Sequence, residues 1–217
     1  MTKAKAPLRI AVLLSGSGTS LENLFEHIDR GLPAEVVCVV ASKKSAFGLT
    51  RASNRGVPAI AVPRRDHPDV ASFNDALHAA LAPFEADLIC LLGFMSPFEL
   101  RDRFVGRALN VHPALIPAFS GKGFYGHHVH EAVLKKGVKW TGATVHFVSE
   151  GYDEGPILLQ GTVAVRDDDT PDSLAERVQA LERELVPEAV RLIADGRVRI
   201  EDGRTRIAPA DPAAPDV

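Results

Sequence analysis

The residue types best suited to chemistry in this sequence are an asparagine and a histidine at the end of one apolar segment, in Asn110-Val111-His112-Pro113. In an extended chain the side chains at positions i and i+2 point to the same side, so Asn110 and His112 are expected to share one face. Pro113 biases His112 toward extended backbone, which favours that geometry. A neutral hydrogen-bond donor beside a titratable ring suits the stabilisation of an oxyanion and the transfer of a proton. We therefore predict a catalytic site at this strand end.

A second candidate is Asp153, which lies in the glycine-rich turn 150–156 between two expected strands. An aspartate in such a turn most often has a structural role. Beside an Asn-x-His strand end, however, it becomes a candidate to orient the imidazole and stabilise its charge. On the expected strand before this turn Thr144 and His146 share a face, and two interpretations of His146 remain open. It either supports the site from behind or is a core histidine with satisfied hydrogen bonds.

A glycine-rich turn follows the first apolar run, at Gly16-Ser17-Gly18-Thr19-Ser20, and opens a helical pattern. Backbone N–H groups and hydroxyls at a helix N-terminus favour anions. The turn lacks the third glycine of a dinucleotide fingerprint and the lysine of a P-loop. One interpretation is a structural turn with a serine N-cap. The other is a site for a phosphate monoester, favoured by the position after the first strand of an open α/β sheet.

The remaining candidates for metal or redox chemistry are weaker. His127, His128 and His130 form a cluster with no carboxylate-rich partner set, so we expect a helix start near a substrate-facing loop and no metal. Cys38 and Cys90 lie in separate apolar runs, which predicts buried thiols in a reduced cytoplasm.

The composition predicts one globular domain, or at most a domain with a small appendage. Of its 217 residues, 46% are hydrophobic and 24% charged, enough for a sizeable core. The net charge of -3 offers no overall electrostatic basis for binding nucleic acid or membranes. The longest apolar run, 88–95, is too short to span a bilayer, and residues 1–7 contain no separate signal-peptide core. We therefore expect a cytoplasmic protein.

Apolar runs alternate with helical patterns, which predicts an α/β fold with a doubly wound, mostly parallel sheet covered on both faces. Strands are expected at 8–14, 35–41, 57–62, 87–92 and 108–112. Helices are expected around 21–28 and at 47–55, 70–81 and 98–104, the last one short.

The pattern changes after residue 140. Strands at 141–149 and 157–165, joined by a short turn, predict an antiparallel addition at the sheet edge. A long C-terminal helix is expected at 171–194, with Thr170 at its N-cap and Pro187 as a kink or break. A small hairpin is expected around Asp202-Gly203, pairing 197–200 with 204–207, and a disordered tail over 208–217.

Taken together, these motifs resemble those of the phosphoribosylglycinamide formyltransferases, a family of folate-dependent transformylases of purine synthesis. The resemblance extends in order from residue 8 to about 195, over the segments 14–21, 42–49, 92–95, 109–117, 141–148 and 153–160. The Asn-x-His-Pro and Asp-x-Gly-Pro elements are specific to formyltetrahydrofolate hydrolases and transferases as a group. The Ser-Gly-x-Gly-(Ser/Thr) opening points to the glycinamide ribonucleotide member.

The resemblance implies roles for individual residues. The catalytic set would be Asn110, His112 and Asp153, with Thr144 and His146 as possible supporting groups. The substrate phosphate would be bound by Gly18, Thr19 and Ser20, and the folate by Phe94, Met95, Ser96, Pro97, Phe98 and Val148. The single formyltransferase domain, 1–207, would then comprise a nucleotide-phosphate half, 8–110, and a catalytic and folate half, 111–207.

The sequence departs from the family pattern at three places. The family often has asparagine where this chain has Ser20, and Arg-Ile-Leu where it has Ser96-Pro97-Phe98. An arginine that some members use for the folate falls near Val70, with Arg64 and Arg65 close by in the sequence. These departures concern the ribonucleotide contact and the folate tail.

The implied reaction transfers the formyl group of 10-formyltetrahydrofolate, as co-substrate, to the amine of 5-phosphoribosylglycinamide. Asn110 and a protonated His112 would stabilise the tetrahedral oxyanion, and Asp153 would support the charged ring. No metal is expected, and the resemblance allows a homodimer.

Three alternatives to this reaction are weighed. A formyltetrahydrofolate deformylase would use a similar set with water as acceptor, but that family carries an N-terminal regulatory domain, whereas here the first strand starts almost at once. A methionyl-tRNA formyltransferase is disfavoured because nothing basic follows the catalytic domain. A binding module that uses only the glycine loop would take a phosphorylated ligand without turnover.

Overall fold

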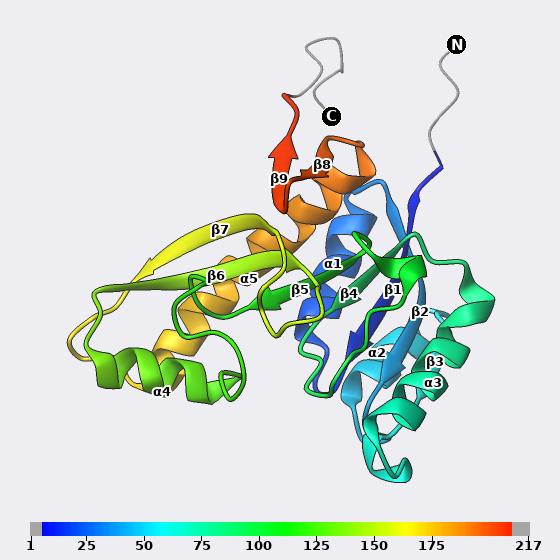
Figure 1. The fold of residues 1–217 in the computed structure, drawn as a ribbon, viewed down its shortest axis with the longest axis horizontal. Coiled ribbons are helices and arrows are strands. Elements are labelled where there is room, and N and C mark those ends of the chain that lie inside the picture. The colour runs from blue at the N-terminus through cyan, green and yellow to red at the C-terminus, as the bar shows by residue number, and fades with distance from the viewer. Residues whose placement is uncertain (1–5, 210–217) are drawn as a thin grey trace.

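A seven-stranded sheet with β1 (Leu8–Leu14) and β4 (Leu88–Leu91) near its middle forms the centre of the computed structural model, which describes residues 6–209 (Figure 1). The strand order is β3-β2-β1-β4-β5-β6-β7. The other strands are β2 (Ala34–Ala41), β3 (Ala59–Ala61), β5 (Ala108–His112), β6 (Trp140–Phe147) and β7 (Ile157–Ala164). Pairs from β3 to β5 are parallel, whereas β5–β6 and β6–β7 are antiparallel. The predicted mostly parallel sheet with an antiparallel edge addition is therefore confirmed.

Helices cover both faces of this sheet, as expected for strands that are buried on both sides. Residues of β1 alternate between two cores, with Ile10 and Val12 in one and Ala11 and Leu13 in the other. The helices are α1 (Thr19–Asp29), α2 (Phe47–Asn54), α3 (Val70–Leu81), α4 (His127–Lys136) and α5 (Pro171–Ala194), with short 3₁₀ turns η1 (Arg64–Asp66), η2 (Ala82–Phe84) and η3 (Asp102–Phe104). Among the helices of residues 6–209, none has the length and apolar character needed to cross a membrane.

The two cysteines lie on opposite faces of the sheet. Cys38 belongs to the core under α3, and Cys90 to the core under α1 and α5. Both are buried free thiols, and burial raises the pKa of each to about 12. The predicted burial of both thiols is confirmed, and a thiol with so high a pKa carries almost no thiolate at neutral pH.

The order in which successive strands are added to the sheet reverses between β1 and β4. From β1 the chain runs outward to β2 and β3, then returns to β4 on the other side of β1 and continues to β5. In open α/β sheets such a switch point leaves a crevice outside the carboxyl ends of the two strands, where ligands bind. The loops that follow β1 and β4 therefore flank the expected site.

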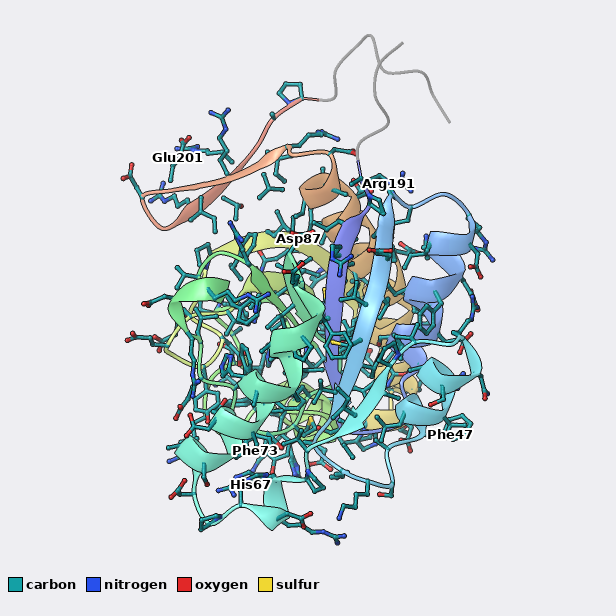
Figure 2. The ribbon with its side chains drawn as sticks, turned by 90° about the vertical axis from the view of Figure 1, so that its right-hand side faces the viewer. Phe47, His67, Phe73, Asp87, Arg191 and Glu201 are labelled. Carbon is teal, nitrogen blue, oxygen red and sulfur yellow. The ribbon has the colours of Figure 1, made fainter. Side chains whose placement is uncertain are left out.

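The predicted short helix at 98–104 is wrong except for its last turn, η3. Side chains of α3 take up the backbone hydrogen bonds that a helix would have used. The Asn74 amide oxygen accepts from the Glu99 N–H at 2.8 Å, and His78 Nε2 lies 2.9 Å from the Glu99 carbonyl oxygen. The segment is thereby held in a non-helical form against α3. Figure 2 shows the same layer from the side, with Phe73 of α3 directed at the sheet.

The C-terminal elements follow the sequence prediction closely. Thr170 caps α5 in a reciprocal box with Ser173, and β8 (Val198–Glu201) pairs with β9 (Arg204–Ile207). Asp202 and Gly203 both have positive φ, as a two-residue hairpin turn requires. Ala208, expected to begin a disordered tail, still donates its N–H to the Arg197 carbonyl at 2.8 Å. The rest of the expected tail, 210–217, and residues 1–5 of the segment expected to lack a signal core lie outside the described residues.

Pro187 lies inside α5, yet the helix continues through it over 24 residues. The expected break is therefore wrong. A proline removes the N–H that would have bonded to the carbonyl four residues earlier, here that of Arg183. Asn23 of α1 fills this vacancy, because its Nδ2 donates to the Arg183 carbonyl oxygen at 2.9 Å. A side chain from a neighbouring helix thus satisfies the group that Pro187 leaves free.

This compensation predicts a coupling between the two residues. We expect Asn23→Ala to lower the free energy of unfolding by about 0.5–1 kcal/mol, the net value of one such hydrogen bond. In a Pro187→Ala background the cost should shrink, because the new backbone N–H at position 187 can bond to the Arg183 carbonyl. Urea unfolding of the four proteins of this cycle measures both terms. An unchanged cost in the two backgrounds would contradict the compensation.

Candidate active site

A cleft of about 1150 Å³ opens at the switch point between β1 and β4. Its walls are the loops after β1 and β4, the end of β5, the turn after β6, the segment before α4, and one face of α5. Thirteen of the fourteen predicted site residues, all except Thr144, line this cleft: Gly18, Thr19, Ser20, Phe94, Met95, Ser96, Pro97, Phe98, Asn110, His112, His146, Val148 and Asp153. Residues far apart in the sequence are thus gathered in one concave site.

The register of β5 against β6 determines how the predicted catalytic residues face their neighbours. Asn110 lies opposite His146, and His112 lies opposite Thr144. The Asn110 amide nitrogen is 3.1 Å from His146 Nε2 and 3.5 Å from Asp153 Oδ1. Both amide N–H groups are therefore directed at partners within the site, and the contact with Asp153 is at the length limit of a hydrogen bond.

Asp153 is held by an unusual backbone and by several donors. Its φ is 60°, and a side chain at Gly155 would collide with the Phe147 carbonyl oxygen. Its Oδ2 accepts from the Gly121 N–H at 2.9 Å and lies 3.5 Å from His112 Nδ1, while Oδ1 lies 3.6 Å from His146 Nε2. Although burial favours the neutral acid, the contacts with His146 and Gly121 hold the pKa of Asp153 below its usual value. The group is therefore a carboxylate at neutral pH.

His112 is almost fully buried, and its two ring nitrogens face different partners. Nε2 is 2.8 Å from the Phe119 carbonyl oxygen, which can only accept, so we assign the ring proton to Nε2. Nδ1 faces the Asp153 carboxylate. Burial lowers the pKa of His112, and Asp153 opposes that shift only in part. In the free site, burial therefore favours the neutral form of the ring.

The two predicted supporting residues have separate tasks. His146 is buried within the site, where its Nδ1 lies 3.0 Å from the Phe147 carbonyl and its Nε2 faces Asn110. It is thus both a hydrogen-bonded core histidine and a neighbour of the catalytic group. Thr144 does not reach the cleft. Its hydroxyl donates to the Ala114 carbonyl at 2.7 Å and accepts from the Ile116 N–H at 3.2 Å, so it fixes the loop that follows His112.

The glycine-rich turn after β1 forms an uncapped helix N-terminus on the cleft. The N-cap of α1 is Gly18, with φ 71°, and within residues 6–209 no side chain caps the helix. The serine N-cap considered from the sequence is therefore wrong. The first N–H groups of a helix have no intrahelical acceptor. Those of α1 are free to bind an anion, with the Thr19 and Ser20 hydroxyls beside them.

The predicted folate residues form the opposite part of the cleft lining. Phe94 stacks on Phe73 with ring centroids 6.4 Å apart, and the Met95 N–H donates to Ser15 Oγ at 2.8 Å. Val148 is tied by its N–H to the Ala108 carbonyl at 2.8 Å. Val70 also lines the cleft, whereas neither Arg64 nor Arg65 is among the lining residues.

The histidine cluster at the start of α4 is placed as expected, near a cleft-facing loop. His127 pairs with Asp172 at 2.7 Å, and His128 with Glu131 at 3.3 Å. His130 is buried, which lowers its pKa to about 4. Within the described part of the chain, no group of three His, Cys, Asp or Glu side chains is arranged to hold a metal ion.

Sequence reasoning missed several polar or aromatic residues of the cleft, and among them are four from the loop before α4 and from α5. They are Lys122 and Tyr125 from the loop before α4, and Gln179 and Glu182 from α5. Glu182 interrupts the buried stripe of α5 between Val178 and Val186, a signal that the helical pattern contains. Burial raises the pKa of Glu182 to about 7. Perturbed carboxyl groups of this kind are typical of functional sites.

Comparison with known proteins agrees with this geometry. The sequence profile of a family described as formyl transferase matches residues 8–190. The chain is 39% identical to the chloroplastic phosphoribosylglycinamide formyltransferase of Arabidopsis thaliana, over 90% of this chain and 68% of the relative. It is also 39% identical to the trifunctional purine biosynthetic protein adenosine-3 of Bos taurus, over 90% of this chain but only 19% of that much longer protein. The chain thus spans about a fifth of the trifunctional relatives' length.

A solved structure gives the same result for the fold. The structure of glycinamide ribonucleotide transformylase 1 from Symbiobacterium toebii superposes with a TM-score of 0.88 at 38% identity, covering 96% of this chain and 98% of that one.

The contact between Asp153 and His112 predicts a measurable change in titration. In Asp153→Asn the negative charge that raises the pKa of His112 is lost, so that pKa should fall further below its usual value. A pH titration of the His112 ring by NMR measures the shift. Asp172→Asn, which removes the partner of surface His127, is the matched control and should leave the His112 pKa unchanged. A pKa that rises in Asp153→Asn would contradict the contact.

The raised pKa of Glu182 predicts how stability depends on pH. Below pH 4.5 the carboxyl is neutral in both folded and unfolded protein, and stability is lost as the pH rises toward 7, because only the unfolded chain ionises readily. The loss is at most about 3 kcal/mol. Glu182→Gln should therefore match the parent at pH 4 and be more stable at pH 8 in urea unfolding.

The exposed Glu184 on the same helix supplies the control, Glu184→Gln. A stabilisation by Glu182→Gln that does not grow with pH would refute this account of Glu182.

Proposed function

Since this chain belongs to the formyl transferase family, we propose that it transfers the formyl group of 10-formyltetrahydrofolate to the amine of 5-phosphoribosylglycinamide, a step of purine biosynthesis. One observation carries the proposal. The group Asn110, His112 and Asp153 shares a single cleft with an uncapped helix N-terminus. A small substrate with an amine at one end and a phosphate at the other needs both features.

The phosphate end of the substrate would bind at Gly18, Thr19 and Ser20. Backbone N–H groups at the start of α1, the helix dipole and two hydroxyls all favour an anion there. Gln179 and Glu182 lie three residues apart on the cleft face of α5 and suit the hydroxyls of a sugar. The nucleotide-phosphate half, 8–110, and the catalytic and folate half, 111–207, are part of this proposal.

The folate would occupy the part of the cleft lined by residues 94–98 and Val148. The rings of Phe94 and Phe98 and the exposed side chain of Met95 offer apolar contact to a flat heterocycle. Backbone N–H and C=O groups of the same loop and of the turn after β6 can form hydrogen bonds with its polar edge. Such a division into apolar walls and a few polar groups is usual in cofactor sites.

The proposed chemistry is a direct transfer. The substrate amine attacks the formyl carbon, and the carbonyl oxygen becomes an oxyanion near the Asn110 amide and the His112 ring. The ring enters neutral, takes up a proton from solvent as the negative charge develops, and returns it when the carbonyl re-forms; the Asp153 carboxylate stabilises the protonated ring. The bond from carbon to folate N10 breaks as N10 takes up the proton lost by the amine, relayed by water at Asp153. Holding both substrates in one cleft supplies much of the remaining rate.

Two further expectations belong to the proposal. They are a cytoplasmic location, drawn from the sequence, and a possible homodimer, drawn from the family resemblance.

The acceptor distinguishes this function from its nearest alternative. The same catalytic group could use water as acceptor, as in a formyltetrahydrofolate deformylase. The anion-binding loop in the same cleft favours a phosphorylated acceptor, because hydrolysis of the folate alone would not require it. We expect the purified protein to release deformylated folate from 10-formyltetrahydrofolate only when glycinamide ribonucleotide is present. The change in folate absorbance measures this release. Release without the amine would instead indicate the deformylase.

Variants of the catalytic group complete this assay. His112→Ala and Asp153→Asn should each reduce turnover by about 10²- to 10⁴-fold, the usual range for groups that move protons or stabilise an oxyanion. His128→Ala, an exposed ring outside the cleft that pairs with Glu131, is the control and should keep near-parent turnover. Near-normal rates in both catalytic variants would refute the site. Binding of the ribonucleotide with no turnover in the parent protein would favour a binding module.

A further inference from the structure

One side chain of α2 reaches the back of the proposed phosphate loop, Gly16–Ser20. Arg51 Nε donates to the Ser17 carbonyl oxygen at 3.0 Å, and its Nη1 pairs with Glu22 Oε2 at 3.0 Å. Ser17 belongs to the loop, and Glu22 to the first turn of α1. A single guanidinium therefore connects the loop to the helix that it opens. The planar fork of arginine is suited to bonding two acceptors in fixed directions.

The backbone of α2 also contacts this loop directly. A Cβ built on Gly18 would lie 2.7 Å from the Gly48 Cα, and the Gly48 N–H donates to the Gly16 carbonyl at 3.2 Å. Gly48 itself is pressed against Leu14, the last residue of β1. The backbone of the loop thus packs directly against the backbone of α2, and α2 packs against the last residue of β1. This contact gives the loop a rigid backing.

The two hydrogen bonds from α2 orient two peptide groups of the loop. In a trans peptide the carbonyl and the following N–H point in opposite directions. Gly48 holds the Gly16 carbonyl toward α2, so the Ser17 N–H points away from α2. Arg51 holds the Ser17 carbonyl, so the Gly18 N–H points the same way. The residues of this loop line the cleft, and a carbonyl turned into it would repel an anion.

We propose that Arg51 is a positioning residue for the phosphate end of the substrate, acting through the Ser17–Gly18 peptide without touching the substrate. The proposal rests on the function given above. Because the preset peptide favours anion binding and is remote from the formyl carbon, Arg51 affects binding of the phosphorylated substrate and leaves the chemical step unchanged.

Arg55, one turn further along, is a matched control for Arg51. It also pairs with Glu22, at 3.3 Å, and lies over a phenylalanine ring, Phe25 at 5.0 Å, as Arg51 lies over Phe47 at 5.1 Å. The exposed fractions of the two side chains are similar, 26% for Arg51 and 33% for Arg55. Arg55 bonds to Asp29 in place of the loop. The two arginines therefore match in charge and packing and differ in the contact with Ser17.

The experiment compares Arg51→Ala, Arg51→Lys and Arg55→Ala with the parent enzyme. We expect Arg51→Ala to raise the KM for glycinamide ribonucleotide and the inhibition constant of inorganic phosphate by about tenfold, close to 1.4 kcal/mol. The kcat and the KM for 10-formyltetrahydrofolate should stay unchanged. Arg51→Lys should restore only part of the affinity, because a single ammonium cannot bond Ser17 and Glu22 with the fork geometry. Arg55→Ala should leave both constants as in the parent.

Thermal unfolding separates this role from a general loss of stability. Both alanine variants lose one pair with Glu22 and one ring contact, so both should lower the Tm to a similar extent. Equal KM changes in Arg51→Ala and Arg55→Ala, unchanged phosphate affinity in Arg51→Ala, or a fall in kcat alone would each overturn the proposal. If the parent enzyme shows no amine-dependent turnover, the proposed function fails, and calorimetric titration with inorganic phosphate still tests the role of Arg51.

Discussion

The antiparallel pairing of β5 with β6 is the constraint on which the site depends. It sets Asn110 opposite His146 and His112 opposite Thr144, and it directs the turn after β6 back over the end of β5. That turn carries Asp153 to within 3.5 Å of His112 Nδ1. A shift of β6 by one residue would move His146 and Thr144 to the other face of the sheet, away from Asn110 and His112. The grouping of Asn110, His112 and Asp153 is thus a consequence of strand pairing more than of any single contact.

The parallel part of the sheet supplies the other half of the site. The switch point between β1 and β4 brings the loop 16–20 and the loop 92–98 to the same edge, although they are far apart in the sequence. Ser15 connects these loops, because its buried hydroxyl accepts from the Met95 N–H at 2.8 Å, and the same hydroxyl lies 2.6 Å from that of Ser42, which follows β2. Two parts of the cleft lining with different chemistry therefore lie side by side at one sheet edge. This arrangement suits a transfer between two bound molecules.

Local sequence rules predicted an element well where its own residues determine its structure. They predicted it less well where a side chain of another element binds its backbone. The strands and long helices follow from hydrophobic periodicity, which reports burial directly. The segment 98–104 has a helical pattern, but Asn74 and His78 of α3 bind its backbone and keep most of it non-helical. Pro187 should interrupt α5, but Asn23 of α1 satisfies the carbonyl that it frees. None of these three partner residues can be identified from sequence spacing, because each lies on a different helix from the segment that it binds.

The sequence by itself determined that Asn110 and His112 share a face, because side chains alternate along any strand, and that a glycine-rich turn opens the first helix. It also marked Asp153 as a candidate by its glycine neighbours. Tertiary structure alone decided that Asp153 reaches His112, that burial lowers the pKa of this ring, and that Glu182 turns into the cleft with a raised pKa. The physical reason is the distance along the chain over which each effect acts. Alternation and turn chemistry act over a few residues, whereas desolvation and charge pairing depend on every element that closes around the group.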